Sequence, residues 1–182
     1  MRRKYLTSAE VMHLLDIISS KSTSCRDYCM IRMAFLHGLR VSELTSLTLN
    51  DYDPFSRSIY IRRLKGGLST SHPLLRDEYL SLDLWLKERK NNSGVSSPWI
   101  FLTRQGKKMS RQRFYQILKY YGSLSEISVP IHPHMLRHAC GYGLAEKGND
   151  TRIIQDYLGH RNIRHTVIYT ATNPHRFRRI WD

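Results

Sequence analysis

Six polar side chains along the sequence have types suited to chemistry on a phosphate. They are two arginines, one lysine, two histidines and one tyrosine: Arg40, Lys65, His134, Arg137, His160 and Tyr169. In a phosphoryl transfer, arginines neutralise charge that develops on the phosphate oxygens, a proton donor assists the leaving oxygen, and a protein nucleophile replaces water. No carboxylate cluster, P-loop or CxxC motif accompanies them. The set favours phosphoryl transfer without a metal.

The first two candidates lie where the chain is expected to turn. Arg40 and Glu43 are three residues apart at an expected helix start, so they share one face and can form a buried ion pair. A surface salt bridge is the plainer alternative. Lys65 precedes Gly66 and Gly67 at an expected bend, where a solvated turn is the plainer alternative. Spacing alone leaves both choices open.

Two histidines and an arginine follow Pro133, a residue that suits the first turn of a helix. His134, Arg137 and His138 then lie on one helix face. The two histidines have the spacing of a zinc pair, but the HExxH motif needs Glu where this chain has Met135, and Arg137 would oppose a metal. We therefore predict no metal and favour a phosphate site, with a DNA-facing surface helix as the alternative.

The last two candidates lie close together near the end of the chain. Gly159 is expected to end one helix and Asn162 to cap the next, with His160 at the turn between them. Tyr169 follows His160 by nine residues, near the end of a short helix. A tyrosine at such a place is more often a core or interface residue than a nucleophile, and that alternative stays open.

Helices are expected to position most of these side chains. A capping box from Thr7 to Glu10 precedes apolar residues at helical spacing. The expected helices cover residues 8–19, 26–37, 42–47, 76–90, 110–121, 134–146, 151–158 and about 163–170.

A small sheet is expected to carry the lysine. Residues 51–56 have the composition of a turn, and residues 58–64 alternate in polarity as a strand does. After the glycine-rich bend, residues 69–74 complete a hairpin or small antiparallel sheet, and a short strand is expected over residues 99–102. The prediction is an α+β fold, mostly helical, forming a single domain over residues 1–182.

The charge of the chain indicates a polyanionic partner. The 182 residues include 29 Lys and Arg against 15 Asp and Glu, a formal net charge of +14. The excess is spread along the sequence, so it is expected on the folded surface and not in a basic tail. Nucleic acid is the first expectation, although a ribosomal or histone-like protein would also be basic. No apolar run is long enough to cross a membrane, and the polar start is not a signal peptide. With only three cysteines, the chain is expected in the cytoplasm.

Taken as a set, the motifs resemble the catalytic domain of the tyrosine recombinase (phage integrase) family. The set comprises Arg40-x-x-Glu43, Lys65, His134-x-x-Arg137, Leu158-Gly159-His160 and Tyr169, whose order and spacing fit over nearly the whole chain. The segments IHPHMLRHACGYGLA and DTRIIQDYLGHRNIRHTVIYTATN are similar to recombinases that invert the promoter segment of bacterial fimbrial operons. The resemblance implies phase variation by DNA inversion.

The resemblance also implies a role for each residue. Tyr169 would attack the scissile phosphodiester to form a 3′-phosphotyrosyl link, and Arg40 and Arg137 would bind its non-bridging oxygens. Lys65 would protonate the 5′-oxygen, His134 would act as acid or base near the nucleophile, and His160 would hydrogen-bond the phosphate. Glu43 would position residues of the site without contacting the phosphate itself. Because the phosphotyrosine conserves the bond energy, neither ATP nor another cofactor is implied.

The chain departs from the larger family at its N-terminus. Most members carry an N-terminal core-binding domain that closes around DNA, and here only about six residues precede the first expected helix. The domain's own basic residues would then contact phosphates: Arg62, Arg63, Lys107, Lys108, Arg111 and Arg113. A solvated basic face is the alternative for each of them. In the tail, Phe177, Ile180 and Trp181 would dock on a neighbouring protomer or pack on their own domain.

The resemblance implies double-stranded DNA with inverted repeats as the partner, and a tetramer on two sites. DNA-bending accessory proteins and association with the bacterial nucleoid would accompany it. A type IB topoisomerase, which relaxes supercoils by the same chemistry, is one alternative. A non-catalytic DNA-binding regulator is another, although a pure binder has no use for all six residues.

Overall fold

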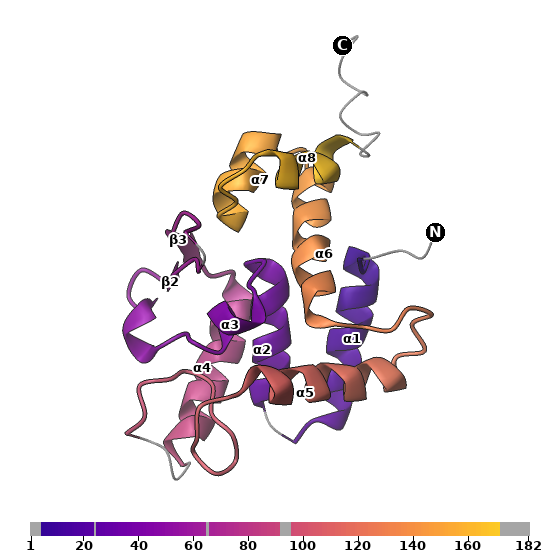
Figure 1. The fold of residues 1–182 in the computed structure, drawn as a ribbon. Helices are drawn as coiled ribbons and strands as arrows, with labels where there is room; N and C mark the ends of the chain where they lie inside the picture. Colours follow the sequence, from indigo (N-terminus) through magenta and orange to yellow (C-terminus); the bar gives the residue numbers. More distant parts are fainter. Residues whose placement is uncertain (1–4, 24, 65, 92–95, 172–182) are drawn as a thin grey trace.

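The computed structural model describes residues 5–23, 25–64, 66–91 and 96–171, and these form a mostly helical molecule with a small sheet (Figure 1). The helices are α1 (Ser8–Lys21), α2 (Cys25–Leu36), α3 (Val41–Leu44), α4 (Arg76–Lys90), α5 (Arg111–Leu124), α6 (Pro133–Glu146), α7 (Thr151–Leu158) and α8 (Arg164–Ala171), with a 3₁₀ turn, η1, at Leu49–Asp51. The strands are β1 (Tyr52–Asp53), β2 (Ser58–Ile61) and β3 (Thr70–Pro73). The predicted α+β class is confirmed.

The first helix begins where its capping box predicts. The Thr7 hydroxyl accepts a hydrogen bond from the Glu10 backbone N–H at 3.2 Å, and the Glu10 carboxylate accepts from the Thr7 N–H at 2.8 Å. These bonds satisfy two backbone donors that the helix start leaves without partners.

The sheet is antiparallel, with strand order β1-β2-β3. Ile59 and Ile61 of β2 are buried, whereas Tyr60 between them is 43% exposed, as strand alternation requires. Two expectations need correction. Part of the turn expected over residues 51–56 pairs with β2 as β1, and the strand expected over residues 99–102 forms only isolated bridges, from Thr48 to Trp99 and from Leu102 to Lys108.

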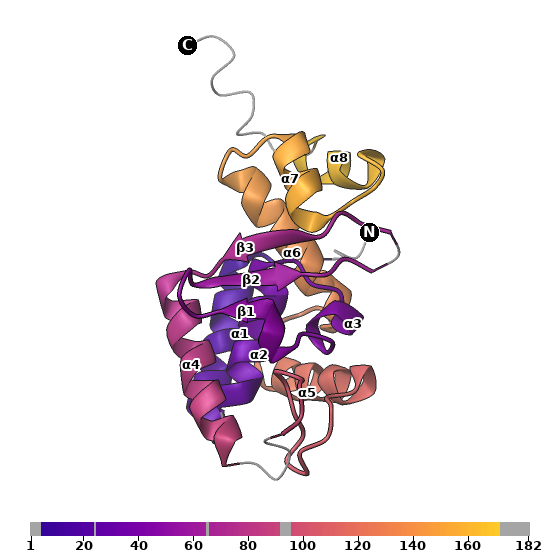
Figure 2. The same cartoon turned by 90° about the vertical axis from the view of Figure 1, so that its left-hand side faces the viewer.

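The main core lies around α2, which packs against α1, α4 and α6. The buried Trp85 ring of α4 belongs to this core, and its indole N–H donates to the Ile100 carbonyl at 3.0 Å. A second, smaller cluster lies where α7 and α8 meet α6, and it includes Cys140, Leu158 and Tyr169. The sheet lies below α7 and α8, with β3 at the edge nearer to them (Figure 2). Helix α6 therefore joins the main core to the part of the chain that carries Tyr169.

Candidate active site

Arg137 is fixed by backbone carbonyls at the ends of two helices. It is 2% exposed, and its guanidinium donates to the Gly38 carbonyl at 2.5 Å and to the Leu158 carbonyl at 2.8 Å. Burial lowers the pKa of Arg137 to about 10, with the neighbouring Arg40 and Arg63 charges acting in the same direction. Arg137 therefore stays protonated at neutral pH, and the groups that accept these two hydrogen bonds are backbone carbonyls.

Glu43 holds Arg40, as the spacing predicts. One carboxylate oxygen accepts from the Arg40 backbone N–H at 2.9 Å, and the other accepts from the Arg40 guanidinium at 2.7 Å. The Glu43 side chain is only 1% exposed and that of Arg40 is 27% exposed, so the carboxylate is buried and the guanidinium reaches the surface. Burial alone would raise the pKa of Glu43, but the Arg40 N–H and the Arg63 charge outweigh it and lower that pKa.

Arg63 is inside the protein, and its predicted role as a DNA phosphate contact is wrong. Its guanidinium donates to Glu43 at 3.0 Å, to the His37 carbonyl at 3.0 Å and to the Tyr157 carbonyl at 2.6 Å. The reason is strand alternation: Arg63 follows Ile61 by two residues, so it continues the inward face of β2. Arg63 is thus a buried support of the site.

Three guanidiniums share a single buried carboxylate in this part of the structure. Arg40 and Arg63 contact Glu43 directly, and an Arg137 nitrogen lies 3.8 Å from the same side chain. One negative charge cannot neutralise three positive charges, so the region keeps an excess of positive charge. Such an excess, presented by planar donors, suits a phosphate group.

Tyr169 packs against α6 at a glycine. A Cβ atom at Gly141 would lie 2.6 Å from the Cε2 and Cζ atoms of Tyr169, so only glycine allows the ring this close. The Tyr142 ring meets that of Tyr169 edge-on, with centroids 5.1 Å apart. The hydroxyl oxygen of Tyr169 lies 3.0 Å from Nδ1 of His138. Burial raises the pKa of Tyr169 to about 12, although the Arg137 charge opposes the shift.

His160 lies beside Tyr169 at the turn that Gly159 creates. Gly159 has the left-handed φ of 67° that the predicted helix end requires, and a Cβ there would meet Arg63 Cγ at 2.5 Å. The His160 ring lies parallel to that of Tyr169, with centroids 6.4 Å apart, and its Nδ1 is 2.9 Å from the Thr166 hydroxyl. Burial, with the nearby Arg137 charge, lowers the pKa of His160 to about 3, so this imidazole is neutral.

Arg40 and His134 open onto a common groove. The groove has a volume of about 800 Å³ and lies between α3, the start of α5 and the start of α6. Its lining also includes Arg111, one of the predicted DNA contacts. Burial, followed by the Arg137 charge, lowers the pKa of His134. Lys65 and the tail residues Phe177, Ile180 and Trp181 lie outside the described residues.

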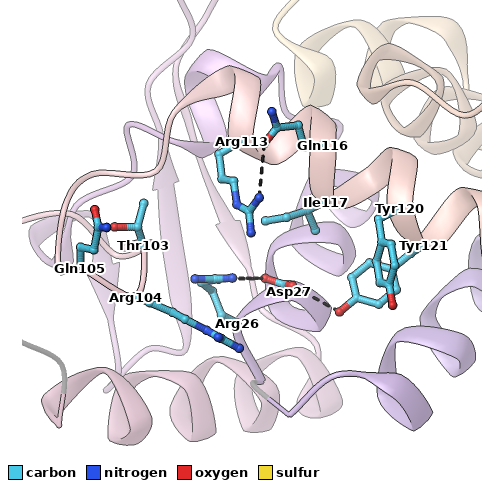
Figure 3. Close-up of a pocket in the computed structure, with 10 residues that line it drawn as sticks. All are labelled: Arg26, Asp27, Thr103, Arg104, Gln105, Arg113, Gln116, Ile117, Tyr120 and Tyr121. Carbon is cyan, nitrogen blue, oxygen red and sulfur yellow. Dashed lines mark hydrogen bonds and ion pairs between the residues drawn. The ribbon is translucent and has the colours of Figure 1, made fainter.

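The other predicted DNA contacts have varied surroundings. The Arg62 side chain is 60% exposed and pairs with Asp51 at 2.5 Å. Lys107 is exposed, and Lys108 lies over the Trp99 ring at 3.6 Å. Arg113 lines a separate hollow of about 730 Å³ between the start of α2 and α5 (Figure 3). These four stay predictions, as does Arg111.

Among the described residues, His, Cys, Asp and Glu side chains do not gather in groups of three or more that could hold a metal ion. Over the same residues, we find no helix with the length and apolar character needed to cross a membrane.

Comparison with known proteins identifies the family. A family model described as "Phage integrase family" matches residues 4–176. The chain belongs to this family. It is 49% identical over 181 residues to type 1 fimbriae regulatory protein FimB of Escherichia coli K12, covering 100% of this chain and 90% of FimB. It is 50% identical to FimE of the same strain, covering 92% of that protein.

Solved structures agree with the family assignment. The crystal structure of XerA recombinase superposes with a TM-score of 0.82 at 26% identity, covering 96% of this chain and 62% of that one. The predicted resemblance to tyrosine recombinases, and to fimbrial ones in particular, is confirmed. The chain is a tyrosine site-specific recombinase.

Three contacts in the site are not predicted by the sequence. His138, expected on the helix face of His134 and Arg137, contacts Tyr169. Thr166 contacts His160, and Arg63, expected on the DNA-facing surface, contacts Glu43. The alternation of buried and exposed residues along β2 indicates that Arg63 points inward. No comparable signal marks Thr166, because its contact depends on how α8 folds back on the turn at His160.

Proposed function

We propose that the protein cleaves and rejoins double-stranded DNA through a covalent 3′-phosphotyrosyl intermediate on Tyr169. The observation that carries this proposal is the cluster of three guanidiniums around the Glu43 carboxylate. One of the three, Arg137, lies on α6, the helix against which the Tyr169 ring packs. A cation-rich site beside a tyrosine supplies the charge neutralisation and the nucleophile that a metal-free phosphoryl transfer needs.

Each catalytic residue has a role in this proposal. Arg40 and Arg137 bind the non-bridging oxygens, and Glu43 keeps Arg40 oriented. Tyr169 attacks phosphorus while Lys65 protonates the departing 5′-oxygen. The neutral His160 hydrogen-bonds the phosphate, and His134, at the rim of the groove, acts as an acid or base. Because the phosphotyrosine preserves the bond energy, a DNA 5′-hydroxyl can reverse the reaction without ATP.

DNA would be held by the basic surface around the groove. Arg62, Lys107, Lys108, Arg111 and Arg113 are the candidate phosphate contacts, and Arg111 shares the groove with Arg40. One structural neighbour is XerH recombinase bound to its palindromic difH substrate, and another is a lambda integrase dimer bound to a core site. Both likenesses are below 25% identity and support the fold.

The biological reaction would be inversion of a fimbrial promoter segment. The names of the two fimbriae regulatory relatives, together with identity near one half, support this choice of substrate. Inversion needs two inverted repeats and therefore four protomers, one for each cleaved strand. The protein would act in the cytoplasm on nucleoid DNA, with DNA-bending proteins helping to bring the two sites together.

Covalent capture tests the proposal. A nicked duplex carrying a candidate fimbrial repeat lets the cleaved fragment diffuse away, so the phosphotyrosyl adduct accumulates and survives SDS. Wild-type protein should form the adduct and Tyr169→Phe should not. No wild-type adduct on such repeats, or an adduct with the variant, would contradict the mechanism. On a plasmid with two inverted sites, relaxation without inverted product would indicate a topoisomerase instead.

A further inference from the structure

Tyr169 has a close hydrogen-bonding neighbour that is not one of the six candidate catalytic residues. Its hydroxyl oxygen lies 3.0 Å from Nδ1 of His138, whose side chain is half-buried on α6. The two rings have centroids 5.8 Å apart. His138 directly follows Arg137, so adjacent residues of one helix carry the phosphate-binding guanidinium and the contact to the nucleophile.

Tyr169 cannot act as a nucleophile without losing its proton. Burial raises the pKa of Tyr169 to about 12, so at neutral pH the hydroxyl is protonated. The Arg137 and Arg40 charges favour the phenolate without removing the proton. A buried hydroxyl nucleophile in such a site needs an adjacent base within hydrogen-bonding distance.

The neighbouring histidines are less well placed for this step. Nδ1 of His160 lies 2.9 Å from the Thr166 hydroxyl, and the centroid of its ring is 6.4 Å from that of Tyr169, farther than the 5.8 Å of His138. His134 meets the His138 ring edge-on at a centroid distance of 4.7 Å and lines the groove on α6. His138 is the one whose ring nitrogen contacts the Tyr169 oxygen.

The contact is built into the packing of α6 and α8. Gly141, on the turn of α6 after His138, lets the Tyr169 ring lie directly on the helix, and Tyr142 closes against its edge. These packing contacts fix the position of the Tyr169 ring. They therefore orient its hydroxyl toward His138 together with the hydrogen bond itself.

We propose that His138 is the general base that removes the proton from Tyr169. As the Tyr169 oxygen forms its bond to phosphorus, the O–H bond breaks and the proton moves to Nδ1 of His138. The P–O bond to the 5′-oxygen breaks and that oxygen takes a proton from the acid. On rejoining, the DNA 5′-hydroxyl attacks phosphorus and returns its proton to the acid, the bond between phosphorus and the Tyr169 oxygen breaks, and His138 returns its proton to that oxygen. This proposal rests on the phosphotyrosyl mechanism proposed above.

Two substitutions separate a base from a mere hydrogen-bonding partner. His138→Ala removes the ring, whereas in His138→Asn the side-chain oxygen takes the place of Nδ1 as an acceptor but is not basic at neutral pH. Both variants should form the covalent adduct about 10²–10⁴-fold more slowly than wild type, the range typical of general bases. His13→Asn on α1, an exposed histidine, is the matched control and should cleave normally. Near-wild-type cleavage by His138→Asn would overturn the proposal.

A change of leaving group shows whether a slow variant is impaired in tyrosine deprotonation or in protonation of the leaving oxygen. With sulfur in place of the bridging 5′-oxygen, the leaving group needs no acid, so a variant that lacks the proposed acid Lys65 should regain its cleavage rate. The His138 variants should stay slow, because tyrosine deprotonation is unaffected by this change. Recovery of the His138 variants would place this residue on the leaving-group side and refute its role as the base.

Folding and the proposed function are checked with the same samples. His138→Asn should bind the duplex with wild-type affinity in a gel shift and keep the melting temperature of wild type, so its slow cleavage reflects chemistry. Absence of a wild-type adduct would refute the phosphotyrosyl mechanism and the role of His138 together. A normal wild-type adduct with undiminished His138→Asn cleavage would refute only the role of His138.

Discussion

Replacing Arg63 by alanine distinguishes an internal support from a DNA contact. The side chain of Arg63 is fully buried, and four groups accept its hydrogen bonds: the Glu43 carboxylate and the Gly38, His37 and Tyr157 carbonyls. Removing one partner of a buried ion pair costs about 3–5 kcal/mol because the other partner stays buried and uncompensated. For a chain of this length the melting temperature should fall by about 6–20 °C.

The neighbouring Arg62 provides a matched control. Its side chain is 60% exposed and pairs with Asp51, so Arg62→Ala should cost about 0–1 kcal/mol. Calorimetry of the two alanine variants measures this difference, and duplex binding at several salt concentrations measures phosphate contacts. Each lost contact would reduce the log–log salt slope by about 0.9. If Arg63→Ala melts within about 2 °C of wild type and loses one such contact, our placement of Arg63 is refuted.

Three further predictions concern the same region. Gly141→Ala should slow adduct formation at least tenfold, because the added methyl carbon would lie 2.6 Å from the Tyr169 ring; unchanged cleavage kinetics would show that the ring need not sit there. Glu43→Gln should destabilise the fold by about 1–3 kcal/mol in urea titrations, because it leaves buried guanidiniums uncompensated, and a neutral result would contradict the charge count given above. Burial, with contributions from His37 and Arg63, lowers the pKa of His72 to about 3, so the unfolded chain takes up a proton first as pH falls below about 6.5. The contribution of His72 to the free energy of unfolding should therefore be fully present above that pH and decline from there toward pH 3, by up to about 1.4 kcal/mol per pH unit. His72→Asn should reduce the slope of the unfolding free energy against pH, measured by urea unfolding between pH 7 and 5. An unaltered slope would exclude His72 as its source.

Local patterns predicted most of the helices, because caps and apolar spacing act over a few residues. The capping box at Thr7 and the left-handed Gly159 both lie where the sequence places them. The prediction for Arg63 is wrong because it rests on the charge of the residue, whereas the inward face of a strand decides where the side chain lies. The short strand β1 was missed because its two residues gain their pairing from β2, and turn composition does not report such a partner.

The candidate site was predictable as a set of residue types but not as a set of contacts. The pair of Arg40 and Glu43 is predicted because residues three positions apart on a helix are neighbours in space. The contact between His138 and Tyr169 depends on α8 packing against α6, and these residues are 31 apart in the sequence. Spacing in the sequence does not show how closely α6 and α8 approach each other. That distance depends on Gly141, whose missing side chain leaves room for the Tyr169 ring.

The shared carboxylate has a consequence for the stability of the free protein. With Arg40, Arg63 and Arg137 sharing the charge of Glu43, mutual repulsion among the guanidiniums lowers the stability of the fold. Burial is the main cause of the lowered pKa of Arg137, and the charges of Arg40 and Arg63 add to it. A bound oxyanion would relieve that repulsion, and any ligand that prefers the folded state raises its stability by mass action. Sulfate or phosphate should therefore act as a thermal protectant of this recombinase in proportion to its occupancy, and storage or crystallisation without such an anion would leave the enzyme in its least stable form.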